Sequence, residues 1–125
     1  MASLTLTLDD ASARARYCVS GTDIFVMGHY PGNPIFPGVL ILDMLIELGE
    51  ALGARRFGSA SITRVVRVQY LKASLPGDVL ELEVSVKAEA DQVLTLVATA
   101  SRGGAVCTRA TFACSALTLP ESAHA

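Results

Sequence analysis

Residues 39–52 read VLILDMLIELGEAL, and this apolar stretch decides the fold. On a helix drawn over it, apolar side chains cover most of the surface, and the carboxylates of Asp43, Glu47 and Glu50 share one narrow stripe. A helix of this composition has to be covered by other elements on nearly all sides. Gly53 is the expected end of the helix, because glycine is common just past a helix C-terminus.

Alternating apolar and polar residues predict β-strands on both sides of this helix. The predicted strands cover residues 3–7, 13–19 and 23–27 before it and residues 60–71, 79–87, 92–101 and 105–117 after it. Gly103-Gly104 has the composition of a tight hairpin turn between the last two strands. One buried helix with hairpin-linked strands predicts an α+β fold, in which a single antiparallel sheet wraps around one long central helix.

The length and composition exclude several classes of protein. The chain has 125 residues, of which 51% are hydrophobic, and a formal net charge of -2. We assign residues 1–119 to a single domain and residues 120–125 to a disordered tail. A chain without a basic excess is not expected to bind nucleic acid, and the apolar excess predicts a protein–protein interface.

Targeting signals and metal-binding motifs are not visible in the sequence. No apolar run reaches the roughly 18 residues of a membrane span, and the N-terminus lacks the pattern of a signal peptide. We therefore expect a cytoplasmic protein with no membrane partner. The three cysteines, Cys18, Cys107 and Cys114, form no C-x-x-C pair, which predicts reduced thiols and no metal site.

Residues 29–38 read HYPGNPIFPG, a loop that its three prolines make stiff and that leads directly into the helix. His29, at the start of this loop, is expected to have a fixed position near the free N–H groups of the helix start. An isolated histidine is more often a structural residue. The stiff loop and the adjacent helix end favour the alternative, a general base.

Asp43 is the second candidate, five residues beyond Gly38. One interpretation is that Asp43, Glu47 and Glu50 form a solvated stripe. Asp43 has apolar neighbours and is nearer the helix start, so we expect it to lie deeper than the two glutamates and to serve as a general acid. A histidine base, a carboxylic acid and an amide-lined helix end suit proton abstraction next to a carbonyl group.

The segment HYPGNPIFPGVLILD, residues 29–43, closely resembles the signature of the FabZ/FabA-type (3R)-hydroxyacyl-[acyl-carrier-protein] dehydratases, including a carboxylate fourteen residues after the histidine. FabZ-type enzymes carry Glu at that position, and this chain carries Asp, as FabA-type enzymes do. Residues 68–80, VQYLKASLPGDVL, look like the family's strand and Pro-Gly-Asp turn. The resemblance implies a hotdog fold that works as a homodimer, as a heterodimer with a second hotdog subunit, or as a higher oligomer.

The resemblance also implies a role for each motif residue. His29 matches the base that removes the C2 proton of a 3-hydroxyacyl thioester, and Asp43 matches the acid that protonates the departing hydroxyl. In the family these two residues come from different subunits. The backbone N–H of Gly38 matches the donor that binds the thioester oxygen. The product is a trans-2-enoyl thioester, in fatty-acid or polyketide and polyene biosynthesis.

The implied substrate is carried on the phosphopantetheine arm of an acyl carrier protein, with no added cofactor. Arg67 and Lys72 are candidates for contact with this acidic partner. The residues expected to line the substrate tunnel are Tyr30, Pro31, Pro37, Val39 and Leu42. Two alternatives stay open, a hotdog thioesterase and a non-catalytic subunit that pairs with an active homologue.

Overall fold

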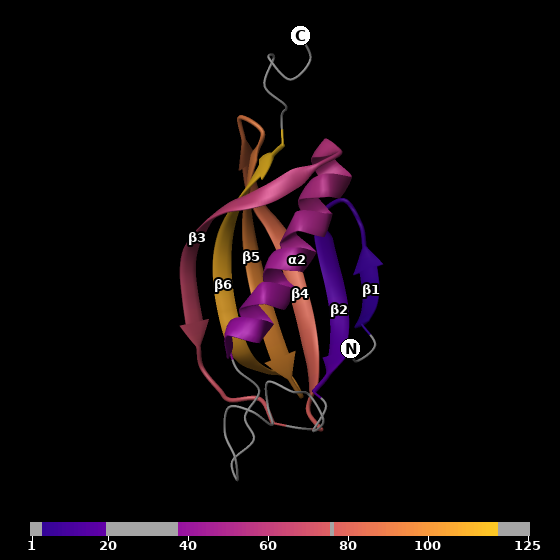
Figure 1. Cartoon of the computed structure of the whole chain (residues 1–125), viewed down its shortest axis with the longest axis vertical. Helices are drawn as coiled ribbons and strands as arrows, with labels where there is room; N and C mark the ends of the chain where they lie inside the picture. The colour runs from indigo at the N-terminus through magenta and orange to yellow at the C-terminus, as the bar shows by residue number, and fades with distance from the viewer. Residues whose placement is uncertain (1–3, 20–37, 76, 118–125) are drawn as a thin grey trace.

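The computed structural model describes residues 4–19, 38–75 and 77–117. The elements in these ranges are β1 (Leu4–Leu8), β2 (Ser12–Cys18), α2 (Gly38–Phe57), β3 (Ala60–Tyr70), β4 (Val79–Ala90), β5 (Val93–Arg102) and β6 (Ala105–Ala116). The strands form one antiparallel sheet in the order β1-β2-β4-β5-β6-β3, and α2 lies diagonally across one face of it (Figure 1). The predicted α+β architecture, a sheet around one long helix, is confirmed.

The core lies between α2 and the inner face of the sheet. In β4 the alternation buries Leu80, Leu82 and Val84, as the sequence predicted, and the end of the strand is exposed. In β5 every second residue from Leu94 to Ala100 is buried, and α2 buries residues spaced three and four apart. The most deeply buried large side chains include Ile41, Leu45, Leu52, Leu80, Leu82, Leu94, Leu96 and Phe112. Among the described residues, no helix is both long enough and apolar enough to cross a membrane.

The helix does not end at Gly53, and that prediction is wrong. A methyl group on Gly53 would lie 2.5 Å from the Sγ of Cys114 and 2.7 Å from the Cβ of Ala60. Glycine therefore stands here because the helix backbone approaches the sheet closely. The helix ends at Phe57, and Gly58 follows with a left-handed φ of 89° and donates its N–H to the carbonyl of Ala54 at 2.7 Å.

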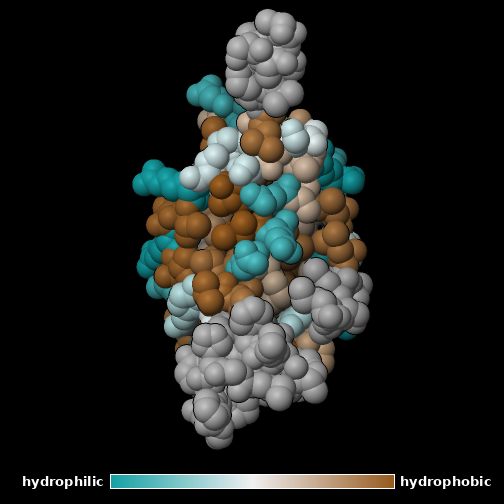
Figure 2. Space-filling model, viewed as in Figure 1, coloured by the Kyte–Doolittle hydropathy of each residue, from teal (hydrophilic) through white to brown (hydrophobic). Residues whose placement is uncertain are grey.

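The helix is also less completely covered than its composition predicted. A single sheet shields one side of it, so the side chains of Asp43 and Glu47 are exposed and that of Val39 is 64% exposed. Leu42, Met44 and Ile46 are half-buried and pack at the border of the core. Hydrophobic and hydrophilic side chains are mixed over this side of the molecule (Figure 2). The described part of the chain therefore leaves part of an apolar helix open.

Two tight hairpins connect the last three strands. Gly103 and Gly104 have φ angles of 56° and 85°, which confirms the predicted turn between β5 and β6. Asp91 and Gln92 make the β4–β5 turn with φ angles of 54° and 61°. The predicted strand at residues 23–27 and the tail at 120–125 lie outside the described residues.

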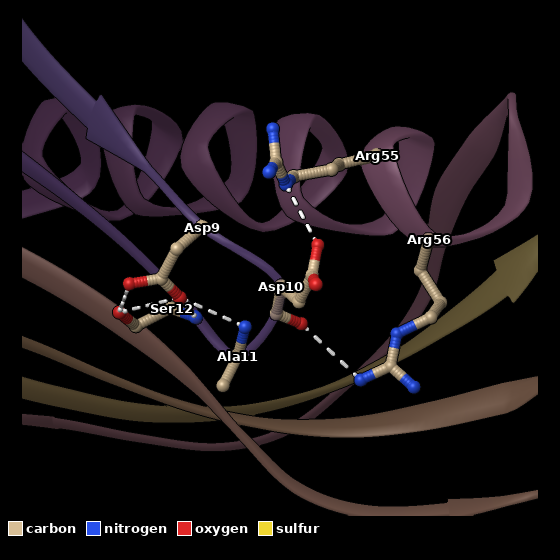
Figure 3. Close-up of polar contacts among 6 residues, drawn as sticks. All are labelled: Asp9, Asp10, Ala11, Ser12, Arg55 and Arg56. Atoms are coloured by element: carbon tan, nitrogen blue, oxygen red, sulfur yellow. Dashed lines mark hydrogen bonds and ion pairs between the residues drawn. The ribbon is translucent and has the colours of Figure 1, made fainter.

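The turn between β1 and β2 is organised by one carboxylate. Asp9 accepts hydrogen bonds from the backbone N–H groups of Ala11, at 2.9 Å, and Ser12, at 2.8 Å (Figure 3). These two bonds hold the pKa of Asp9 below its ordinary value. Local hydrogen bonds to Asp9 therefore fix the shape of this turn.

Arginines at the C-terminal end of α2 attach the helix to this turn and to β4. Arg55 forms an ion pair with Asp10 at 3.0 Å, and Arg56 donates to the backbone carbonyl of Asp10 at 3.2 Å (Figure 3). Arg56 also pairs with Glu89. Positive charge at this end of a helix complements the helix dipole. The opposite end, where α2 begins, carries the candidate site.

Candidate functional site

The start of α2 lies against the end of β3. Gly38, the first residue of the helix, is half-buried, and its φ is not in the left-handed region. A methyl group on Gly38 would lie 2.7 Å from Cδ1 and 2.8 Å from Cε1 of Tyr70. The tyrosine ring therefore lies against the first turn of the helix, whose N–H groups have no carbonyl partner within the helix itself.

The structure describes some of the predicted site residues and not others. His29, Tyr30, Pro31 and Pro37 lie outside the described residues. Gly38, Val39, Leu42 and Asp43 are described, and all four belong to the first two turns of α2. The roles assigned to them stay predictions.

The expected order of exposure along the acidic stripe is wrong. The side chain of Asp43 is exposed, whereas Glu50 is half-buried. Glu50 accepts hydrogen bonds from the backbone N–H of Ile62 at 3.0 Å and from the hydroxyl of Ser61 at 3.3 Å. The reason is that β3 begins beside the C-terminal part of α2 (Figure 1), where Ser61 and Ile62 contact the carboxylate of Glu50. No such contact covers Asp43 among the described residues.

The surroundings of Asp43 are open and largely apolar. Val39, one turn before it, is exposed, and the adjacent Leu42 and Met44 are half-buried. A further surface that excluded water around this carboxylate would strengthen its interaction with a bound molecule. The described part of one chain thus holds one acid and one helix start, on a face that still has room for a partner.

The turn after β3 is fixed by an ion pair that the sequence analysis did not find. Asp78 accepts hydrogen bonds from the backbone N–H of Leu75 at 2.8 Å and from the guanidinium of Arg102 at 2.9 Å, and Arg102 also donates to the carbonyl of Ala73 at 3.2 Å. Burial of Asp78 opposes its ionisation, but these two donors outweigh it and lower the pKa of Asp78. The Pro-Gly-Asp sequence signalled the turn, but no pattern pointed to Arg102, 24 residues away.

This turn also holds the chain where it leaves β2. The N–H of Val19 donates to the carbonyl of Asp78, and the N–H of Gly77 donates to the carbonyl of Val19, both at 2.8 Å. Leu71 and Lys72 each donate a backbone N–H to the carbonyl of Cys107, at 2.7 and 3.2 Å. The segment that follows β3 is therefore tied to both β2 and β6.

The two predicted carrier-protein contacts, Arg67 and Lys72, are both exposed, and within the described ranges neither forms an ion pair. Arg109 is another exposed basic residue without such a pair, as are Arg64 and Lys87. It is opposite Gln69 in the β3–β6 register, on the outer face of the sheet that Arg67 shares. Sequence reasoning missed Arg109, because the pairing of β3 with β6 joins residues far apart in the chain.

A groove of about 570 Å³ lies elsewhere, on the outer face of β2, β4 and β5. Its charged residues neutralise one another in pairs, Arg14 with Glu83 at 3.0 Å and Arg16 with Glu81 at 3.8 Å. None of the predicted site residues that the structure describes lines this groove. Among the described residues, no three His, Cys, Asp or Glu side chains gather as a metal site would require.

Solved structures of similar shape identify the fold. The chain is similar to the dehydratase heterocomplex ApeI:P from Xenorhabdus doucetiae, with a TM-score of 0.73 and 18% sequence identity, over 92% of this chain and 98% of that chain. It is similar to a Streptococcus mutans protein bound to acetyl CoA, with a TM-score of 0.79 and 13% identity, over 92% of this chain and 89% of that one. At these identities the similarity shows the fold alone, which is the expected hotdog fold.

Curated relatives and a family model carry the assignment further. The 3-hydroxyacyl-[acyl-carrier-protein] dehydratase FabZ of a Caulobacter species is 28% identical over 110 residues, which are 83% of this chain and 68% of that protein. The matched segments span between 44% and 68% of the length of such relatives. A model of the ApeI-like family, described as ApeI dehydratase, matches residues 5–109. The chain therefore belongs to the ApeI-like dehydratase family, which confirms the kind of family that its sequence resembles.

Proposed function

We propose that this protein is a 3-hydroxyacyl-[acyl-carrier-protein] dehydratase, which converts a (3R)-hydroxyacyl thioester into the trans-2-enoyl thioester and water. The observation that carries the proposal is the family match over residues 5–109, a range that includes both His29 and Asp43. The FabZ name of the curated relatives supports the same reaction. The pathway would be fatty-acid or polyketide and polyene biosynthesis.

In the proposed reaction two side chains move protons in opposite directions. His29 removes the proton from C2, and the electrons of that C–H bond form the double bond between C2 and C3. The C3–O bond breaks, and Asp43 gives its proton to the departing hydroxyl, which leaves as water. One proton then passes from His29 to Asp43 through solvent and restores both groups. A positioned acid or base typically contributes about 10²–10⁴-fold to the rate.

The negative charge that develops on the thioester oxygen needs a donor that is already in place. The N–H of Gly38, at the start of α2, is the proposed donor, and the positive end of the helix dipole favours the same charge. Donors of this kind are typically worth roughly 3–4 kcal/mol. The proton transfers and this donor complete the reaction, so the proposed mechanism uses no metal and no cofactor.

We infer that the working enzyme is a dimer in which His29 and Asp43 come from different subunits. The exposed side chain of Asp43 supports this arrangement, because a second surface is needed to enclose it. A second support is β3, an edge strand of the sheet, on which Val65 and Val66 are 42% and 52% exposed. Exposed apolar edge strands are sites of pairing with another chain. The second subunit is another copy of this chain or a homologous hotdog chain.

The proposed partner that delivers the substrate is an acyl carrier protein. Arg67 and Lys72 support it, because they form no ion pair with any described residue and an acidic protein is attracted to exposed basic side chains. Val39 and Leu42, on the open side of α2, are proposed to contact the acyl chain, together with Tyr30, Pro31 and Pro37.

The test is an assay of the purified protein with 3-hydroxyacyl thioesters of several chain lengths on a carrier protein. We expect enoyl absorbance that is lost in His29→Ala and greatly reduced in Asp43→Asn. Glu47→Gln is the matched control, because Glu47 is an equally exposed carboxylate one turn further along α2. Free thiol, detected with a thiol-reactive dye, would indicate a thioesterase instead. A chain that is inert alone and active only with a co-purified homologue would indicate a non-catalytic subunit.

A further inference from the structure

The contact between Gly38 and Tyr70 is closer than ordinary packing. A methyl group on Gly38 would meet three carbons of the tyrosine ring, at 2.7 Å from Cδ1, 2.8 Å from Cε1 and 3.4 Å from Cγ. The φ of Gly38 is not in the left-handed region, so an alanine could adopt this backbone. Glycine is therefore required at this position for space, and the ring of Tyr70 is what fills that space.

The ring is carried by a rigid part of the sheet. Tyr70 is the last residue of β3 and pairs with Thr108 of β6. The two residues after it, Leu71 and Lys72, both donate their backbone N–H groups to the carbonyl of Cys107. The backbone that carries the ring is thus held in place, although 52% of the residue is exposed.

We propose that Tyr70 is a positioning residue of the dehydratase site, and the proposal rests on the function proposed above. The ring supports the first turn of α2 from the side of β3 and fixes where the N–H of Gly38 stands. A preorganised donor stabilises charge only at its correct position, and a misplacement of about 1 Å can lower the rate on the order of 10²-fold. The three atoms nearest to the position of that methyl group are all ring carbons, so in this proposal the ring performs the role and the hydroxyl does not.

The test compares Tyr70→Phe, Tyr70→Ala, Gly38→Ala and the double variant Gly38→Ala/Tyr70→Ala in the enoyl assay. We expect kcat to fall on the order of 10²-fold in Tyr70→Ala with a smaller change in KM, because the donor is misplaced while the acyl contacts remain. Tyr70→Phe keeps the ring, so we expect its kcat to equal that of the wild-type protein. Leu71→Ala is the matched control, since Leu71 is 50% exposed and no ring is removed.

The double variant tests whether the effects of the two substitutions on kcat depend on each other, as they should if Gly38 and Tyr70 act through this contact. Gly38→Ala alone is expected to lower kcat, because its methyl group strikes the ring. In the absence of the ring the same methyl group has room, so the double variant falls no further than Tyr70→Ala alone. Tyr70→Leu replaces Tyr70→Ala in every comparison if the alanine variant does not fold.

Two results would overturn the positioning role while leaving the proposed function intact. One is a wild-type kcat in a folded Tyr70→Ala protein, and the other is a double variant whose loss equals the product of the two single losses. A wild-type protein with no turnover overturns the proposed function and the positioning role with it. Melting temperatures of wild type, Gly38→Ala, Tyr70→Ala and the double variant test the contact without an activity assay, because Gly38→Ala should lower the melting temperature only when the ring is present.

Discussion

The carboxylate of Glu50, on α2, accepts a hydrogen bond of 3.0 Å from the backbone N–H of Ile62, on β3. The hydroxyl of Ser61 donates to the same carboxylate oxygen at 3.3 Å. A backbone N–H on an edge strand has to find a partner or face water. Glu50 supplies that partner where β3 passes the helix, and so fixes the start of the strand.

We expect Glu50→Ala to lower the free energy of unfolding by about 1–3 kcal/mol, because the N–H of Ile62 is left half-buried without a partner. Urea denaturation measures the change. Glu47→Ala removes an exposed carboxylate from the same helix and should stay within about 0.5 kcal/mol of wild type. Equal losses in the two variants would mean that the bond to Ile62 contributes nothing.

Gly53→Ala should destabilise the protein by roughly 1–3 kcal/mol through overpacking, even though alanine is the better helix former. The new methyl group would lie 2.5 Å from the Sγ of Cys114 and 2.7 Å from the Cβ of Ala60, and the Cβ of Ala60 can move only with the backbone of β3. Gly49→Ala is the comparison variant with a smaller expected loss of stability. Its methyl group would meet the flexible ends of Ile62 and Leu96 at 3.1 and 3.2 Å, so its loss should be smaller. Thermal unfolding shows which variant loses more stability. A larger loss in Gly49→Ala than in Gly53→Ala would contradict the close approach at Gly53.

Ser74→Ala should leave stability unchanged or raise it by up to about 1 kcal/mol. Ser74 is 1% exposed, and among the described residues its hydroxyl has no hydrogen-bond partner. On folding, such a hydroxyl loses its hydrogen bonds to water and forms none with the protein. Its removal therefore relieves a desolvation cost. The melting temperature gives the sign. A clear loss of stability would show that the hydroxyl has a partner in solution.

The sequence was sufficient for the sheet and for most of the helix, because both depend on periodicity. The alternation that buries Leu80 and Leu82 and exposes Glu81 is a local pattern and needs no knowledge of the partner strand. Gly53 was wrongly predicted to end the helix, because the sequence alone does not distinguish a glycine needed for close packing from a glycine at a helix end. The exposure of Asp43 and the burial of Glu50 depend on where β3 crosses the helix, which is a tertiary feature. The same limit hid the ion pair between Asp78 and Arg102 and the contact between Gly38 and Tyr70.

The ion pair between Asp78 and Arg102 should make stability fall in acid. The folded state holds the pKa of Asp78 below the ordinary value near 3.8, so the folded protein binds this proton less readily than the unfolded chain does. The stabilisation is therefore complete above about pH 5 and is lost as the pH falls below about 4 toward the folded pKa. The difference in melting temperature between wild type and Asp78→Asn should be largest near neutral pH and should narrow below about pH 4.

Asp10→Asn is the control for this pH series. Asp10 also pairs with an arginine at 3.0 Å, but its side chain is 90% exposed, and exposed ion pairs contribute little. Its melting temperature should follow that of wild type across the series. The prediction fails if the difference in melting temperature between wild type and Asp78→Asn does not change with pH. Ionisation of the Asp78 carboxylate would then not explain the stabilisation, and the shape of the turn would.

Mixing two inactive proteins tests whether the proposed site is shared between subunits. If His29 and Asp43 act across a two-fold interface, a dimer of one His29→Ala subunit and one Asp43→Asn subunit has one site with both native residues and one site with neither. Random exchange makes half of the dimers mixed, so the mixture should recover about one quarter of the wild-type activity. Val66→Lys, introduced into both proteins, places a charge on the exposed edge of β3 and should abolish the recovery together with the dimer, as size-exclusion chromatography would report. If each site is built within one subunit, every site keeps one defect and the mixture stays inactive, however completely the subunits exchange.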